Sequence, residues 1–210
     1  MLYLANASSP KVRDAMRAGD LGQMCTPAEG RAPLPGVEWG ADTGCYSTTG
    51  YPGDEKWIAW LEKLIPWQAH CLFAAAPDRF NPALGDDMGL ASLERSRPWL
   101  PIIRDLGYPA ALVAQDGLTV GDVPWEEIDA LFVGGTTEWK LSRSAQRLEV
   151  AAKERGKHLH VGRVNSARRW QITELFGCDT ADGTFLAYGP DQNLTRQARW
   201  PVPNLFGDQA

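Results

Sequence analysis

Short, almost uninterrupted apolar runs recur through the 210-residue chain, and most are followed by turn residues and a helix-like segment. Such runs are typical of strands buried on both faces, as in parallel sheets, whereas strands with one wetted face alternate apolar and polar residues. The rhythm of strand, turn and helix predicts an α/β protein. Seven strands are predicted, over Leu2–Ala7, Val37–Ala41, Cys71–Ala76, Ala110–Ala114, Ala130–Val133, His158–Val161 and Thr184–Tyr188.

Three segments between these runs have the spacing of helices. The apolar side chains of Lys56–Ile65 recur along one stripe, and so do those of Ser142–Arg155 between its charged residues. A third helix is predicted to begin after Asn165, where an Asn-Ser pair can cap it, and to run to Gly177.

Proline and glycine mark the predicted breaks. Pro98 and Pro101 are expected to divide residues 90–106 into pieces, because proline cannot continue a helix. Residues 21–35 contain two proline turns and two glycines, which predicts a long loop over the sheet. No repeat, low-complexity tract or linker divides the sequence, so a single domain is predicted over residues 1–210.

Repeated strand and helix units fit either a doubly wound sheet or a (β/α)8 barrel, and 210 residues is short for a barrel. Polar residues favour the barrel, because nearly every predicted strand is followed by a group capable of chemistry. A barrel gathers the C-terminal ends of its strands into one mouth. We therefore predict a (β/α)8 TIM-barrel-like single domain of reduced size, with a mouth formed by Asn6, Ser8, Asp42, Asp78, Gln115, Glu138, Arg163 and Asp182.

Composition excludes several other classes of protein. The chain is 44% hydrophobic and 22% charged, which is typical of a packed domain and not of a disordered one. No apolar run reaches the roughly 18 residues of a membrane span, and no basic stretch with an apolar core begins the sequence. We expect a cytoplasmic protein with no membrane contact.

The cysteines and histidines predict no bound metal. Cys25, Cys45, Cys71 and Cys178 are widely spaced, with no C-x-C or C-x-x-C pair, so free thiols are expected in place of a zinc site or disulfide framework. His70, His158 and His160 form no metal-like triad and are expected to pack or to donate hydrogen bonds.

Charge is unevenly distributed along the chain. The net charge is −5, yet residues 138–169 carry nine Lys or Arg against three Glu. Such a segment is either a solvated helix face or a surface that faces phosphates. Basicity alone does not separate the two readings.

Three short motifs contain candidate chemistry. Asp42 ends an apolar run in Ala-Asp-Thr-Gly-Cys-Tyr, and Asp182 ends Gly-Cys-Asp-Thr-Ala-Asp. Gly134 and Gly135 close another run, where bare backbone can lie against a planar base and Glu138 can accept a hydrogen bond from it. Each motif taken alone is also compatible with an ordinary turn.

Taken in order, these motifs resemble the tRNA-guanine transglycosylase superfamily, most closely its short phage-type members, which insert 7-deazaguanine bases into DNA. The resemblance spans nearly the whole chain and implies a transglycosylase-like barrel. The segment Asp42-Thr-Gly-Cys-Tyr46 is similar to the family segment whose Asp handles protons. Asp182 matches the last Asp of the family's Gly-x-Asp-x-x-Asp, which is the nucleophile.

The resemblance also implies a set of residues that hold the base. Asp78 follows Pro77 where the family has an Asp at the guanine edge, and Gln115 is similar to its Gln-Gly strand end. The family's Gly-Gly loop is similar to Gly134-Gly135, and its strand end that lines the pocket is similar to His160-Val-Gly162. The implied substrate-binding residues are Asp78, Gln115, Gly134, Gly135, Glu138, His160 and Gly162.

Two departures from the family bear on the substrate. The sequence lacks the C-x-C-x-x-C and His zinc site of the tRNA enzymes, and Gly-Thr-Phe follows Asp182 in place of Cys-x-x-Pro-Thr-Arg. The resemblance therefore implies DNA as the partner more than tRNA, a free 7-deazaguanine base as second substrate, and no metal or cofactor. Expected phosphate contacts are Lys140, Arg163, Arg168 and Arg169.

A homodimer or an accessory protein is compatible with the sequence, and a phage gene would place the protein in the host cytoplasm. Two other functions stay open. A glycosidase would use the same carboxylates on a free nucleoside or sugar, and a non-catalytic relative would keep only the basic face. Retention of both Asp42 and Asp182 counts against the second.

Overall fold

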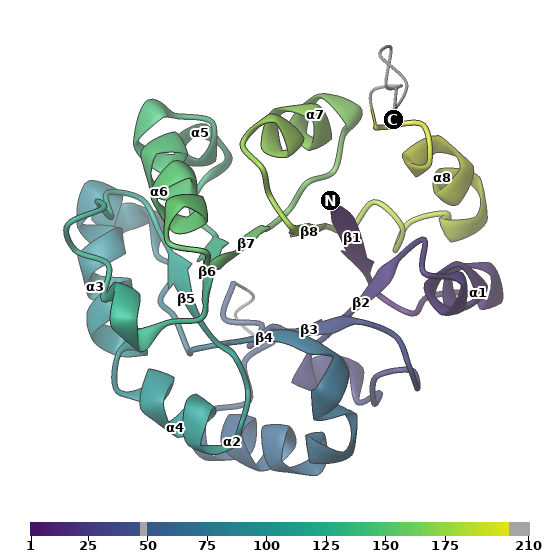
Figure 1. Ribbon diagram of the computed structural model, residues 1–210, viewed down its shortest axis with the longest axis horizontal. Coiled ribbons are helices and arrows are strands. Elements are labelled where there is room, and N and C mark those ends of the chain that lie inside the picture. The colour runs from purple at the N-terminus through teal and green to yellow at the C-terminus, as the bar shows by residue number, and fades with distance from the viewer. Residues whose placement is uncertain (47–49, 202–210) are drawn as a thin grey trace.

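The computed structural model describes residues 1–46 and 50–201, and its strands close into an eight-stranded parallel barrel (Figure 1). Each strand pairs with its neighbours in the sequence, and the first pairs with the last. The predicted (β/α)8 barrel is confirmed. The strands are β1 (Leu2–Ala5), β2 (Gly22–Cys25), β3 (Trp39–Ala41), β4 (Cys71–Ala75), β5 (Ala110–Ala114), β6 (Ala130–Val133), β7 (His158–Val161) and β8 (Thr180–Asp182).

Helices surround the barrel, and two connections are unusually light (Figure 1). Only short 3-10 turns, η1 (Pro27–Glu29) and η4 (Trp125–Glu127), lie between β2 and β3 and between β5 and β6, which explains how a barrel fits a short chain. The other elements are α1 (Pro10–Ala18), α2 (Asp54–Lys63), η2 (Ile65–His70), η3 (Pro82–Asp87), α3 (Met88–Ser96), α4 (Trp99–Asp105), α5 (Thr137–Lys140), α6 (Arg143–Glu154), α7 (Ala167–Leu175) and α8 (Pro190–Gln197).

The three helices predicted from spacing are confirmed as α2, α6 and α7. The Ser166 hydroxyl caps α7 by accepting from the Arg169 N–H, and Gly177 turns the chain away with φ 73°. The break between α3 and α4 falls at Pro98 alone. Pro101 lies in the first turn of α4, where a missing N–H costs no helical hydrogen bond.

Two predicted strand assignments are wrong. The strand β2 lies inside residues 21–35, which were predicted to be a loop, and β8 precedes the predicted strand Thr184–Tyr188, which forms a turn. Both observed strands are short and partly polar, so local propensity does not reveal them. Pairing with neighbouring strands in the barrel makes these segments strands. In β2, a Cβ on Gly22 would lie 2.4 Å from Leu4 Cδ2, so only glycine fits there.

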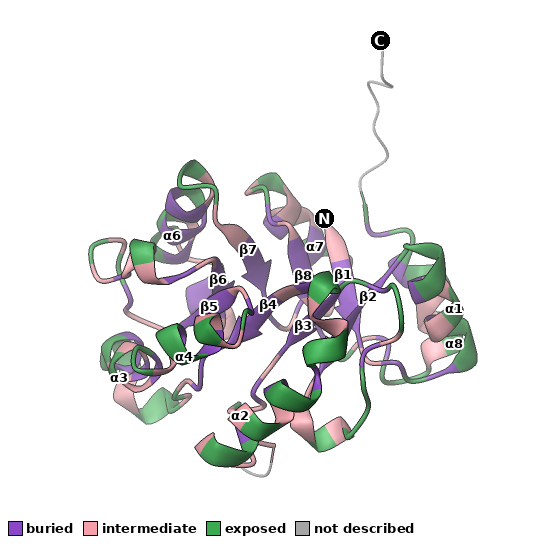
Figure 2. Ribbon diagram, turned by 60° about the horizontal axis from the view of Figure 1, so that its bottom comes forward, coloured by how far each residue is buried: buried purple, intermediate pink, exposed green. Residues whose placement is uncertain are grey.

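The core has two layers. Buried side chains such as Trp39, Trp57 and Tyr108 fill the space between strands and helices, while the outer helix faces are exposed (Figure 2). A second cluster fills the barrel itself, from Leu4 to Phe132, so the lumen is packed below its mouth. None of the helices in residues 1–46 and 50–201 is long and apolar enough to cross a membrane.

Candidate active site

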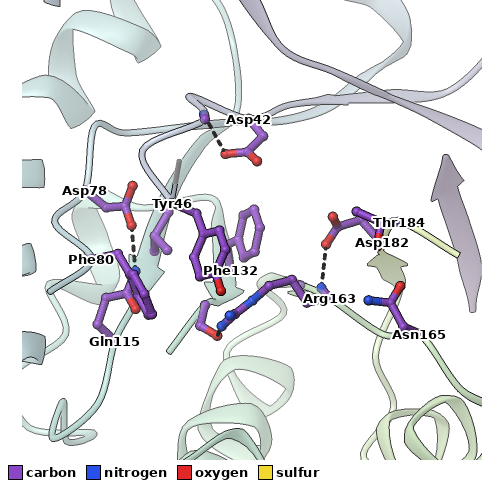
Figure 3. A pocket seen from close by; sticks show the side chains of 14 residues that line it. Asp42, Tyr46, Asp78, Phe80, Gln115, Phe132, Arg163, Asn165, Asp182 and Thr184 are labelled. Atoms are coloured by element: carbon purple, nitrogen blue, oxygen red, sulfur yellow. Dashed lines mark hydrogen bonds between the residues drawn. The ribbon is translucent and has the colours of Figure 1, made fainter. Parts of the chain in front are cut away.

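A cavity of about 420 Å³ opens at the C-terminal ends of the strands, where a barrel gathers its functional groups. Its volume lies within the ordinary range for small-molecule sites. Residues from six strands, β3 to β8, and the loops that follow them line it, and several of their side chains converge on it (Figure 3). The polar residues that line it are Asp42, Asp78, Gln115, Arg163, Asn165, Asp182 and Thr184.

The floor and walls of this cavity are apolar. Val113 and Phe132 line it from β5 and β6. The rings of Tyr46 and Phe80 lie beside it, with centroids 4.6 Å apart (Figure 3). Gly162 allows Phe132 its position, since a Cβ at residue 162 would lie 2.7 Å from that ring. Aromatic rings around a narrow space suit a flat ligand.

Asp42 follows β3 directly and lines the cavity. Its Oδ1 accepts from the Gly44 N–H at 3.2 Å, and Gly44 adopts φ 77°, a conformation that favours glycine. Burial, followed by the negative charges of Asp182 and Asp78, raises the pKa of Asp42 to about 7. Asp42 is therefore suited to hold and release a proton near neutral pH.

Asp78 and Gln115 form a fixed pair. The Gln115 amide donates to Asp78 Oδ2 at 2.6 Å, and its oxygen accepts from the Gly135 N–H at 2.8 Å. The protein thus contacts both ends of the amide, so Gln115 orients Asp78. Burial raises the pKa of Asp78 above its ordinary value.

Asp182 ends β8 and receives two hydrogen-bond donors on one oxygen. The Arg163 N–H lies 3.1 Å from Oδ1, and His160 Nε2 lies 3.2 Å from the same atom. No other residue in the described part of the chain donates to the carboxylate. Both donors thus bind Asp182 Oδ1, which leaves Oδ2 for a ligand.

Arg163 crosses the mouth of the cavity (Figure 3). Its guanidinium lies 4.3 Å from the Tyr46 ring centroid and donates to the carbonyls of Gly134, at 3.1 Å, and Gly135. Its backbone is left-handed, with φ 61°, which is costly for a residue other than glycine. This conformation directs the Arg163 N–H to Asp182.

The structure brings most predicted residues to the cavity and leaves several outside. Asp42, Asp182, Asp78, Gln115, Gly134, Gly162 and Arg163 line it. His160 lies beneath Asp182, and Gly135 is buried behind the wall. Glu138 is exposed on α5 and does not line the cavity, which contradicts its predicted place beside a base.

The predicted basic contacts fall in different environments. Lys140 is buried and donates to the Gly162 carbonyl, and burial lowers its pKa to about 7, so the prediction that it meets phosphate is contradicted by its position. Arg168 is exposed on α7. Arg169 is half-buried and donates to the Arg163 carbonyl at 3.3 Å, so it supports the loop before α7.

The apolar lining of the cavity was not predicted from the sequence. Tyr46 belongs to the motif Asp42-Thr-Gly-Cys-Tyr46 but was not predicted as a site residue, and neither were Phe80, Val113 and Phe132. The period-2 alternation of β5 and β6 places Val113 and Phe132 inside the barrel and was the available signal. Asn165, predicted as part of a helix cap, instead lines the cavity and accepts from the Phe185 N–H at 3.1 Å.

The four cysteines are free, and the described residues contain no group of three His, Cys, Asp or Glu side chains that could hold a metal ion. No protein-family model and no curated protein matches the chain. The fold and the site define a small (β/α)8 barrel whose mouth is lined by apolar side chains and by the carboxyl groups of Asp42 and Asp182. Because this fold serves many reactions, function has to be argued from the site.

Proposed function

We propose that the protein is a base-exchange transglycosylase that replaces guanine in DNA with a 7-deazaguanine derivative through a covalent intermediate between Asp182 and the sugar. One observation carries the proposal: Asp42 and Asp182 face the same cavity as the aromatic rings that can hold a base. The ordered resemblance of the strand-end motifs to guanine transglycosylases supports it independently.

In the first half of the reaction, Asp182 Oδ2 attacks the sugar C1′ and the N-glycosidic bond breaks. The bonding electrons leave with the base through an oxocarbenium-like transition state, and an ester joins the sugar to Asp182. Two donors on Oδ1 support this role, because they fix the carboxylate and leave Oδ2 for the sugar.

Asp42 manages the proton. Guanine leaves readily only when a ring nitrogen is protonated, and the incoming base has to lose a proton before it attacks C1′. A pKa raised to about 7 allows Asp42 to donate in the first half and to accept in the second. After both halves of the exchange, Asp42 has recovered the proton that it donated.

The base lies among Tyr46, Phe80 and Phe132, with its polar edge at Asp78. Gln115 donates one amide hydrogen to Asp78 and accepts from the Gly135 N–H, so it orients that carboxylate, and its second amide hydrogen is left for the base. A guanine-like ring presents N–H donors along this edge, and adenine does not present the same set. The arrangement supports selection of guanine and its 7-deaza relatives.

A base in duplex DNA reaches such a cavity only by leaving the stack. Arg168 is exposed on α7, the helix that follows the loop of Arg163, which supports contact with the flanking phosphates.

Incubation with labelled guanine tests the proposal. Wild-type protein is expected to place label into DNA, and a denaturing gel is expected to show a covalent protein–DNA adduct. Parallel reactions with tRNA and with free nucleosides identify the substrate. Release of base from a nucleoside without exchange would assign a glycosidase, and absence of both adduct and exchange would overturn the proposal. Nucleoside mass spectrometry of DNA from cells that express the chain and make 7-deazaguanine bases tests the second substrate.

A further inference from the structure

A chain of hydrogen bonds runs beneath the cavity to Asp182. His158 Nε2 and His160 Nδ1 both lie 2.8 Å from the Thr180 hydroxyl oxygen, and His160 Nε2 lies 3.2 Å from Asp182 Oδ1. Strands β7 and β8 supply all four side chains, and the pairing of His160 with Thr180 in the barrel sets their register. The reaction proposed above uses only the last member.

These groups lie in the packed interior of the barrel. His160 is fully buried, with the rings of Phe132 and Phe73 at centroid distances of 4.3 and 4.7 Å. Thr180 is buried as well, and the cluster around them is otherwise aliphatic or aromatic. Polar side chains in such surroundings are costly unless their donors and acceptors are paired, and here the chain pairs them.

The contacts determine where the hydrogens lie. Asp182 Oδ1 already accepts from the Arg163 N–H, so His160 Nε2 has to be the donor to that oxygen. A neutral His160 then accepts at Nδ1, which requires the single Thr180 hydrogen. Thr180 in turn accepts from His158, so both rings carry their hydrogen on Nε2.

We propose that His160 is a positioning residue for Asp182, which it holds by Oδ1 in the Nε2–H tautomer that Thr180 and His158 impose. The hydrogen bond turns Oδ2 toward the cavity, where the attack on the sugar takes place. The catalytic part of this inference rests on the proposed function, whereas the tautomer and the contact do not.

The charges around His160 keep its ring neutral. Burial lowers the pKa of His160 below its ordinary value, despite the opposing hydrogen bond to Asp182, and Lys140 on α5 lowers it further. His158 faces it from the same strand and also has a lowered pKa, chiefly because of burial. Tyr3 on β1 and Asp42 after β3 are the other titratable groups near Asp182. The His160 contact should therefore persist across the working pH range.

Nitrogen-15 NMR of the wild-type protein without substrate tests the assignment. Both His158 and His160 are expected to show the Nε2–H tautomer, and the His160 ring is expected to stay neutral at pH values at which an ordinary histidine gains a proton, because burial lowers its pKa. A hydrogen on Nδ1 of His160, or a charged ring at pH 7, would overturn the inference. This measurement needs no activity, so it separates failure of the inference from failure of the proposed function.

A matched pair of variants tests the catalytic part. His160→Phe keeps a ring of similar shape and removes the hydrogen bond, and we expect kcat for exchange to fall about 10- to 100-fold with KM within about twofold. His160→Gln restores an N–H donor without the ring and should recover most of kcat. The pH dependence of exchange should keep its midpoint in both, because Asp42 sets it.

A third variant guards against a fold defect in the first two. Thr180→Val keeps the side-chain shape and removes the hydroxyl between the rings, and a fall in kcat with unchanged KM is expected, with Thr180→Ser close to wild type. Full activity of both His160→Phe and Thr180→Val, or equal losses in His160→Gln and His160→Phe, would overturn the role of His160. If wild type shows the expected tautomers but exchanges no base, the proposed function fails, while the hydrogen bond from His160 to Asp182 is still supported by the NMR result.

Discussion

Asp42 and Asp182 face one cavity, but the strands around them supply different neighbours. Beside β3, Asp42 accepts from the backbone of Gly44, and the charges that act on it, those of Asp182 and Asp78, are negative. At the end of β8, Asp182 accepts from His160 and from the Arg163 backbone on a single oxygen. Two residues of identical chemistry thus occupy unlike environments.

The difference shows how a fold can assign two roles to one side-chain type. A buried carboxyl among like charges keeps its proton to higher pH, while a carboxylate with fixed donors keeps its orientation. The first environment suits proton transfer and the second suits nucleophilic attack. The following predictions test this division, from the largest expected effect to the smallest.

Asp182→Asn should have the largest effect. The substitution keeps the shape and removes the nucleophilic oxygen, so exchange should fall roughly 10⁴-fold or more and the protein–DNA adduct should vanish. The measurement is labelled-base exchange with a denaturing gel.

Asp179→Asn is the matched control. Asp179 pairs with Lys153 at 2.7 Å and accepts from the Leu159 N–H at the opposite end of β8, so its loss should lower stability and leave exchange largely intact. Exchange that survives in Asp182→Asn and disappears in Asp179→Asn would move the nucleophile and refute the division.

Asp42→Asn should slow exchange about 10²- to 10⁴-fold, which is the usual contribution of a positioned acid–base group. The adduct can still form slowly, because Asp182 is intact. In wild type, the rate of the first half-reaction should decline as pH rises through about 7, where Asp42 loses its proton. Single-turnover kinetics against pH measure both effects, and a variant that keeps the wild-type pH profile would exclude Asp42 as the proton donor.

The same substitution should stabilise the fold at high pH. Because the pKa of Asp42 is raised to about 7, the folded protein retains a proton that the unfolded chain releases near pH 4, and stability falls as pH rises between these values. Asp42→Asn removes that loss, so it should exceed wild type by roughly 1–3 kcal/mol at pH 8 and match it near pH 4. Chemical denaturation at the two pH values measures the difference, and a variant less stable than wild type at pH 8 would contradict it.

Substitution of Arg168, the exposed basic residue on α7, should have the smallest effect. Arg168→Glu should weaken DNA binding on all sequences and reduce the salt dependence by about one unit per lost phosphate contact. The buried Lys140 provides the comparison, since Lys140→Met should leave the salt slope unchanged. Equal slopes for wild type and Arg168→Glu would assign Arg168 to a solvated helix face.

Particular residues show how far sequence reasoning reached. The strands β5, β6 and β7 were predicted at their observed bounds; in β5 and β6 burial on both faces leaves a continuous apolar pattern. The strand β2 was missed, since Gly22 is selected by close packing against Leu4 and carries no strand propensity. Asp42, Asp78 and Gln115 were located because they are polar groups just after apolar runs, whereas Asp182 was located from its motif, since β8 itself was not predicted.

The sequence by itself determined that this chain forms strand and helix units with polar residues after the strands, because hydrophobic periodicity and turn chemistry are local properties. Only the tertiary structure decided which side chains meet. It buried Lys140 under the Gly162 carbonyl and placed Glu138 on the surface, although both come from the same short helix. It also joined His160 to Asp182, since register between parallel strands arises when the barrel closes. Contacts between residues far apart in sequence depend on closure and packing, which no local pattern encodes.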